Sequence, residues 1–179
     1  CTLGYRTFGT LDAKKSNAIL VPTWFTGKTS DLAGLIGPGK LFDDNAYYII
    51  LADAIGNGVS SSPSNSAAQP GEKFPAFTIA DMVRTQHRFL TKTLGITHLR
   101  AVTGISMGGM QTFQWMALYP DFMDKAIPIV GTPRQTSYDT LLWSTERLVI
   151  ETIPDKTRAM KIVGDIHCLA WTTPNGVNT

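Results

Sequence analysis

Four short apolar blocks of this chain show no alternation between polar and apolar side chains. They are rich in Ile, Val, Leu and Tyr, and they cover Ala18–Val21, Ala46–Ala52, Leu99–Ile105 and Ala126–Val130. Strands of a parallel sheet that is covered by helices on both faces have this character, because both sets of side chains are buried. A fifth strand-like block, Leu3–Phe8, precedes them. The blocks therefore predict a mostly parallel sheet.

Helical patterns separate these blocks. From Thr78 to Leu94, apolar residues recur at the spacing of one helix face, and Gly95 stands where a helix would end. A second helix is expected over Gly108–Tyr119, because Pro120 would stop it. The order strand, helix, strand, helix, strand is typical of a doubly wound α/β fold.

The end of the chain differs from the rest. Helix-like spacing returns over Thr140–Ile153 and Arg158–Trp171, on either side of Pro154, without a convincing strand. We interpret these two segments as the start of a helical cap. The sequence therefore predicts two domains, an α/β core at 1–133 and a cap or lid at 134–179.

Charge and hydropathy exclude two classes of partner. The 179 residues contain 16 Lys and Arg against 14 Asp and Glu, which gives a net charge of +2. No basic patch or stripe of the kind that binds nucleic acid is visible in the sequence. No apolar stretch approaches the ~20 residues that span a bilayer. We therefore expect a small-molecule substrate, with neither nucleic acid nor membrane as partner.

The cysteine count and the charged fraction also constrain the environment. Cys1 and Cys168 are too few for a disulfide scaffold and match no metal-ligand spacing, so we expect a cytoplasmic protein without a metal site. Charged residues make up 17% of the chain, below the ~25% of an average domain. Part of the surface is therefore expected to be covered by something outside this chain.

The sequence Gly104-Ile105-Ser106-Met107-Gly108-Gly109 follows a predicted buried strand and precedes a predicted helix. It satisfies the pattern G-x-S-x-G in the strand-turn-helix context that gives the pattern its meaning. Such a turn is so tight that Ser106 would be strained, and glycines at 104 and 108 would avoid collisions. Ser106 would then stand at a helix N-terminus, which favours developing negative charge. We predict a nucleophile; the alternative is a glycine-rich turn whose serine only caps the helix.

Acyl transfer also needs hydrogen-bond donors for the oxyanion. In this architecture one donor is the backbone N–H after the nucleophile, here that of Met107, and the other comes from a loop after an earlier central strand. That loop corresponds to Thr23–Gly27, whose Trp24, Thr26 and Gly27 are candidates for the substrate pocket. The alternative is that its aromatic residues belong only to the core.

Four segments of the chain resemble the homoserine O-acetyltransferase group of the α/β-hydrolase superfamily. They are Tyr5–Leu11, Ser16–Val21, Phe77–Val83 and, with the most specific sequence, Gly104–Gln111. The resemblance covers about residues 3–134. It implies an α/β-hydrolase fold with a helical cap, in which 1–133 is the nucleophile half of the core. The family loop His-Ala-Leu-Thr-Gly reads Thr-Trp-Phe-Thr-Gly here.

The resemblance also implies a reaction and an assembly. Ser106 would be acylated by an acyl-CoA co-substrate and would pass the acyl group to a hydroxyl acceptor, while Phe25 and Met107 donate the two oxyanion N–H groups. No bound cofactor is implied. The family resemblance further implies a homodimer joined through cap helices.

The catalytic acid and base have no good candidates in this chain. In the superfamily they follow the serine in the order Asp, then His, on loops after further strands. His87 and His98 precede Ser106. His167 follows it but falls in a predicted helix, where Asp165 would point to a different side. We therefore expect a fragment, incomplete at both ends, that lacks the triad Asp and His.

Three functions stay open on the sequence. The first is a serine acyltransferase, and the second is an esterase that uses water as the acceptor. The two differ in whether the cap excludes water from the acyl-enzyme. The third is an inactive binding or scaffold protein that has kept the serine turn and lost its catalytic partners.

Overall fold

The structure is a computed structural model that describes the backbone of residues 1–171 and the side chains of residues 1–167. The chain divides into two compact units, Cys1–Pro133 and Arg134–Thr179. No helix among the residues described is both long and apolar enough to cross a membrane.

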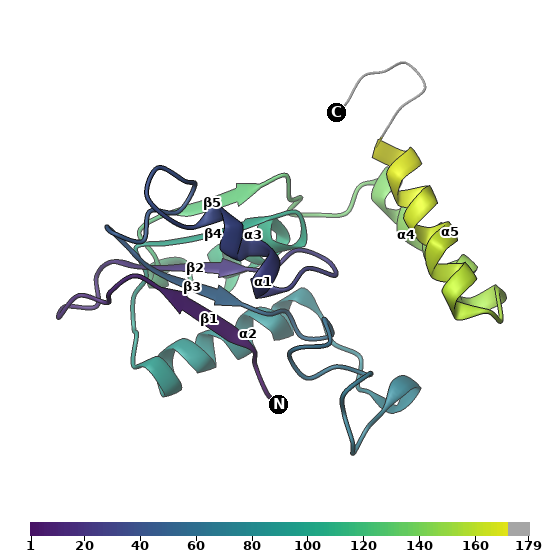
Figure 1. The fold of residues 1–179 in the computed structure, drawn as a ribbon, viewed down its shortest axis with the longest axis horizontal. Coiled ribbons are helices and arrows are strands. Elements are labelled where there is room, and N and C mark those ends of the chain that lie inside the picture. Colours follow the sequence, from purple (N-terminus) through teal and green to yellow (C-terminus); the bar gives the residue numbers. More distant parts are fainter. Residues whose placement is uncertain (172–179) are drawn as a thin grey trace. The chain divides into compact units, whose positions relative to one another are not determined.

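The first unit is built on a five-stranded sheet. Its strands are β1 (Tyr5–Phe8), β2 (Ala18–Pro22), β3 (Tyr48–Ala52), β4 (Ala101–Ile105) and β5 (Ala126–Ile129). They lie in the order β1-β3-β2-β4-β5, with β1 at one edge and β5 at the other (Figure 1). Only β1 runs antiparallel to its neighbour. The predicted mostly parallel α/β sheet is therefore confirmed.

Two long helices connect these strands. They are α2 (Ile79–Phe89), which continues as a π-helical turn η3 (Leu90–Leu94), and α3 (Met107–Leu118). Helix α2 begins where Thr78 accepts a hydrogen bond from the N–H of Asp81, and η3 ends at Gly95 in the left-handed conformation. The shorter elements are α1 (Thr29–Leu32) and the 3₁₀ turns η1 (Ala33–Leu35), η2 (Gly71–Lys73) and η4 (Pro120–Phe122).

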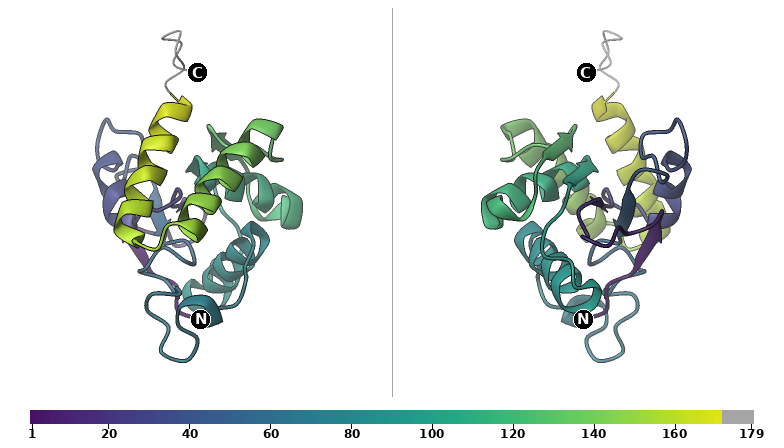
Figure 2. Two further views of the ribbon diagram at one scale, coloured as in Figure 1. Left: turned by 90° about the vertical axis from the view of Figure 1, so that its right-hand side faces the viewer. Right: turned by 90° about the vertical axis from the view of Figure 1, so that its left-hand side faces the viewer.

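Both faces of the central strands β2, β3 and β4 are covered, as their unalternating apolar blocks predict. The same prediction was wrong for the block Ala126–Val130, because β5 is an edge strand and Ile127 is 49% exposed. Side chains on one face pack against α2 and α3, which lie next to each other (Figure 2). Side chains on the opposite face pack against α1 and the segment that follows it. Leu20 and Ile50 belong to the first cluster, whereas their neighbours Ile19 and Ile49 belong to the second. Side chains of neighbouring residues thus fill two cores, one on each face of the sheet. The carboxyl ends of the parallel strands remain as the place where a site can form.

The second unit contains a helical hairpin, formed by α4 (Ser137–Thr152) and α5 (Lys156–Trp171) (Figure 2). Helix α4 begins at Thr136, whose hydroxyl accepts a hydrogen bond from the N–H of Asp139. Pro154 lies in the turn between the helices, where the sequence predicted a break. Residues 172–179 of the predicted cap lie outside the described part.

Candidate active site

Ser106 occupies the turn between β4 and α3 in a conformation that L-amino acids rarely adopt. Its φ is 56° and its ψ is −119°, and it is exposed. Its N–H donates to the carbonyl of Ile129 over 2.9 Å, which extends the ladder between β4 and β5 up to the turn. Its side chain makes no capping hydrogen bond to α3. The alternative of a serine that only caps the helix is therefore not what the structure shows.

Two glycines make this turn possible. A Cβ on Gly104 would lie 2.5 Å from the carbonyl carbon and oxygen of Gly108. A Cβ on Gly108 would lie 2.6 Å from the carbonyl oxygen of Pro22. Both distances are far below van der Waals contact, so only glycine fits at either position. The first turn of α3 consequently lies directly against the end of β2.

The loop after β2 forms a tight turn beside that helix end. The N–H of Gly27 donates to the carbonyl of Trp24 over 3.1 Å, and Thr26 has a φ of 62°. The indole of Trp24 lies over Gly27, where a Cβ would approach its Nε1 to 2.5 Å, and it packs on the core beneath. Phe25 is 50% exposed. The aromatic residues therefore divide, with Trp24 turned to the core and Phe25 to the surface.

A pocket of about 250 Å³ lies between this loop and the start of α3. It is lined by Phe25, Thr26, Ala54, Ile55, Gly56, Asn57, Phe77, Met82 and Met107. Phe25, Thr26 and Met107, which were predicted for the site, thus share one pocket. Trp24 and Gly27 are not among its lining residues. The walls are mostly apolar, which suits the hydrocarbon part of a small ester.

Asp53 holds the loop in place from beneath. It is 1% exposed, and its carboxylate accepts hydrogen bonds from the N–H of Thr29 at 2.9 Å, the hydroxyl of Thr29 at 2.9 Å and the amide of Asn57 at 2.8 Å. The amide of Asn57 also donates to the carbonyl of Gly27 over 3.0 Å. These bonds join the loops after β2 and β3. Sequence reasoning missed Asp53, although an acidic residue directly after a buried strand block was a usable signal.

The two histidines of the first unit lie away from Ser106. His98 precedes β4, and its Nε2 is 2.8 Å from Oδ1 of Asp124, a hydrogen bond that lowers the pKa of Asp124. His87 stacks on Tyr119 with ring centroids 3.9 Å apart, and burial lowers the pKa of His87. Tyr119 follows the C-terminus of α3, about 20 Å along the helix from Ser106. Neither histidine belongs to the serine turn.

His167 belongs to the second unit. Its Nδ1 is 3.0 Å from Oε1 of Glu146, a residue that is 4% exposed, whereas Asp165 is exposed. Glu146 could not be recognised from the sequence as the acidic neighbour of this histidine, because the two residues lie 21 positions apart on different helices. Among the described residues, no group of three His, Cys, Asp or Glu side chains could hold a metal ion.

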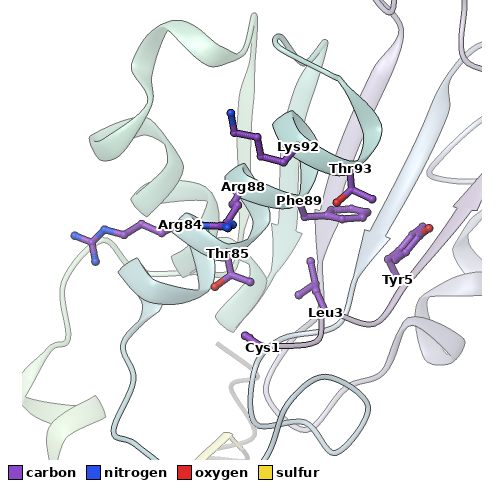
Figure 3. A pocket seen from close by; sticks show the side chains of 9 residues that line it. All are labelled: Cys1, Leu3, Tyr5, Arg84, Thr85, Arg88, Phe89, Lys92 and Thr93. Atoms are coloured by element: carbon purple, nitrogen blue, oxygen red, sulfur yellow. The ribbon is translucent and has the colours of Figure 1, made fainter.

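A larger hollow of about 650 Å³ lies between α2 and the residues around β1. Figure 3 shows Leu3, Tyr5 and Phe89 gathered on one side of it, while the guanidinium of Arg84 points away from them. Arg84 is paired with Asp81 at 3.0 Å. None of the lining residues belongs to the serine turn or to the loop after β2, so size does not identify the active site.

Comparison with known proteins agrees with this geometry. Residues 20–151 match the family described as the alpha/beta hydrolase fold. The chain belongs to the α/β-hydrolase fold family. In α/β hydrolases the nucleophile stands on a sharp turn between a strand and a helix, and Ser106 occupies a turn of that kind.

Curated relatives of this α/β hydrolase include esterases and acetyltransferases. A probable esterase of Corynebacterium glutamicum is 42% identical over 86% of the chain and 45% of its own length. An ethyl acetate hydrolase of Pseudomonas veronii is 45% identical over 83% of the chain and 43% of its own length. A homoserine O-acetyltransferase of Desulfotalea psychrophila is 38% identical over 93% of the chain and 47% of its own length. The chain thus spans less than half the length of these relatives.

Solved structures give the same two groups. The acetyl esterase MekB superposes with a TM-score of 0.90 at 36% identity, covering 97% of this α/β-hydrolase chain and 54% of that one. A homoserine O-acetyltransferase of Bacillus anthracis superposes with a TM-score of 0.79 at 27% identity, covering 93% and 54%. The resemblance to the homoserine O-acetyltransferase group is therefore confirmed, and the chain is also similar to esterases.

Proposed function

We propose that this chain carries the nucleophile of a serine esterase that acts on esters of short acyl groups, with Ser106 as the acylated residue. The observation that carries the proposal is the strained Ser106, exposed at the carboxyl end of β4 and at the N-terminus of α3. Strained backbone conformations of this kind cluster at functional sites. The side chain of Ser106 does not cap α3, so helix capping does not account for the strain.

The chemistry follows from the groups around the pocket. The Oγ of Ser106 attacks the ester carbonyl carbon, its proton passes to a base, and the carbonyl oxygen becomes an oxyanion. The N–H of Met107 and the N–H of Phe25 donate to that oxyanion. When the carbonyl re-forms, the alcohol leaves with the proton, and the acyl group stays on Ser106 as an ester. Water then attacks this ester and releases the acid.

The base that takes the proton lies outside residues 1–133 in this proposal. His87 and His98 are the histidines of that unit, and both lie far from Ser106. A histidine and its carboxylate would have to reach the carboxyl edge of the sheet from elsewhere in the complete protein. The same requirement holds for either acceptor, water or alcohol.

Short acyl groups are favoured by the relatives and by the pocket. Two relatives are named for acetate esters, an ethyl acetate hydrolase and an acetyl esterase. Phe77 lines the pocket of about 250 Å³, and its ring lies so close to Gly56 that a Cβ there would be 2.7 Å from the Cζ of Phe77. Acetyl and similarly small groups suit such a pocket.

Acyl transfer is the second candidate. Homoserine O-acetyltransferases of several organisms are 37–42% identical to the chain, so a hydroxyl acceptor in place of water fits the same serine turn. Acyl-CoA would then be the acyl donor. The bulkier loop Trp24-Phe25 distinguishes this chain from the family loop and supports placing the esterase first.

The test uses the protein expressed from its complete reading frame. It is incubated with ethyl acetate or p-nitrophenyl acetate, and separately with acetyl-CoA in the presence and absence of homoserine. An esterase releases acetate from the esters at a rate that homoserine does not change. Release of CoA that requires homoserine would favour transfer, and the Ser106→Ala variant should abolish either activity. Activity that survives in Ser106→Ala would refute both.

A further inference from the structure

Two glutamines lie completely buried behind the candidate oxyanion donors. Gln86 on α2 and Gln111 on α3 are each 0% exposed. The Nε2 of Gln86 donates to the Oε1 of Gln111 over 2.6 Å, and the indole N–H of Trp115 donates to the Oε1 of Gln86 over 2.9 Å. Burying an amide is unfavourable unless it is hydrogen-bonded, so the loss of any of these hydrogen bonds would destabilise the folded protein.

The indole fixes the direction of the whole chain of bonds. A Trp side chain can only donate, so the atom of Gln86 that faces Trp115 must be its oxygen. The nitrogen of Gln86 then faces Gln111, whose oxygen must accept from it. The amide nitrogen of Gln111 is consequently turned the other way, toward the backbone of the site.

That nitrogen reaches both segments that carry the candidate oxyanion donors. The Nε2 of Gln111 lies 3.1 Å from the carbonyl oxygen of Thr23 and 3.3 Å from the carbonyl oxygen of Met107. Thr23 stands two residues before Phe25 in the loop after β2, and Met107 is itself the other donor. One NH₂ group, with its two hydrogens, therefore bridges the loop and the helix.

We infer that Gln111 is a positioning residue which sets the separation of the two oxyanion-binding N–H groups, with Gln86 and Trp115 fixing its orientation. The inference rests on the proposed function, because it presumes that Met107 and Phe25 donate to an oxyanion. Backbone donors stabilise an oxyanion only when both lie at hydrogen-bond distance from it. A small change in their separation therefore reduces the stabilisation of the transition state more than the binding of the substrate.

The main test is Gln111→Met in the protein expressed from its complete reading frame. Methionine fills a similar volume and removes the bridge. We expect kcat for p-nitrophenyl acetate to fall about 10- to 100-fold, while KM stays within about threefold. The matched control is Gln114→Met, the same change three residues further along α3 at a half-buried position. Gln114→Met should keep kcat within about twofold.

A second variant separates positioning from mere stability. Trp115→Phe keeps an aromatic ring in the core but removes the indole N–H together with part of the ring system, so the two amides lose the group that orients them. We expect kcat to fall about three- to tenfold at a temperature where thermal melting shows the variant fully folded. This variant also carries the test if Gln111→Met does not fold. A purely structural role would lower the melting temperature and leave kcat of the folded protein unchanged.

The inference and the proposed function fail in different ways. If the wild-type protein hydrolyses no ester and Ser106 is not labelled by a serine-directed phosphorylating reagent, the proposed function fails, and the inference fails with it. If the wild type is active and Ser106→Ala is not, the proposed function stands. An unchanged kcat in folded Gln111→Met, or in Trp115→Phe where Gln111→Met does not fold, then overturns the inference alone.

Discussion

At the scale of single residues, the site depends on glycines, which leave room for a tight turn, and on a buried carboxylate. Ser106 adopts its positive φ because Gly104 and Gly108 leave room for the turn to close. The pattern of glycines around a serine made this part predictable, since each glycine removes one specific collision. The position of Asp53 after a strand block was a usable signal, but its hydrogen bonds were not predictable, because its partners Thr29 and Asn57 come from loops whose course the sequence does not specify.

Replacing Gly108 with Ala tests the close approach of α3 to β2. The new Cβ would lie 2.6 Å from the carbonyl oxygen of Pro22, so we expect a loss of about 1–3 kcal/mol in the free energy of unfolding and a lower kcat. Urea denaturation measures the first. Gly164→Ala is the matched control, because nothing lies within 4 Å of that Cβ in α5 and alanine should stabilise the helix by about 0.5–1 kcal/mol. Equal stability of the Gly108→Ala variant and the wild type would contradict the geometry.

Asp53→Asn tests the support of the loop after β2. One carboxylate oxygen becomes an NH₂ group that faces the donors of Thr29 or Asn57, so we expect a loss of about 1–3 kcal/mol of stability together with reduced kcat. Chemical denaturation and ester hydrolysis give the two readouts. Asp121→Asn, at an exposed position, serves as the control and should change stability by less than about 0.5 kcal/mol. An Asp53→Asn variant as stable as this control would refute the supporting role.

The burial of His87 is expected to make the stability of the fold depend on pH. Burial lowers its pKa below the ordinary 6.5, so the unfolded chain binds its proton more tightly than the folded protein. Stability therefore falls as the pH drops through 6.5 toward the lower folded pKa. His87→Phe keeps an aromatic ring against Tyr119 and cannot titrate. Between pH 7.5 and pH 5, urea midpoints should fall less in this variant than in the wild type; parallel falls would contradict the assignment.

At the scale of secondary-structure elements, the pattern of apolar residues predicted the strands and the long helices. All five strands and the four long helices α2, α3, α4 and α5 lie within a few residues of their expected positions. The four-residue helix α1 was missed, because one turn shows no apolar period. The bridge from Gln111 to Thr23 was also missed. It joins residues 88 positions apart, and no local pattern reports the partner of a buried amide.

The segment before α2 is expected to control acyl-chain length. Phe77 lines the pocket beside Met107 and packs against Gly56. Phe77→Ala should open the pocket, and we expect the ratio of kcat/KM for p-nitrophenyl hexanoate to that for the acetate to rise about tenfold. Leu41→Ala, at an exposed position that does not line this pocket, is the control and should leave that ratio unchanged. An unchanged ratio in Phe77→Ala would show that the acyl chain lies elsewhere.

At the scale of the whole molecule, the chain is an α/β hydrolase that spans less than half the length of its curated relatives. Its first unit unites the strained serine, two candidate oxyanion donors and an apolar pocket. That grouping follows from topology, because parallel strands bring their carboxyl ends to one edge of the sheet. The catalytic acid and base could not be assigned from the sequence, and the histidines of the first unit lie elsewhere in the fold.

The most direct test of this account is covalent labelling of Ser106. The protein expressed from its complete reading frame is treated with diethyl p-nitrophenyl phosphate, which phosphorylates activated serines and releases p-nitrophenol. Peptide mass spectrometry then locates the adduct. The account predicts one adduct per chain, on Ser106, with loss of esterase activity in proportion to labelling and no adduct in Ser106→Ala. Activity that persists in a fully labelled protein, or an adduct on another residue of an active enzyme, would contradict it.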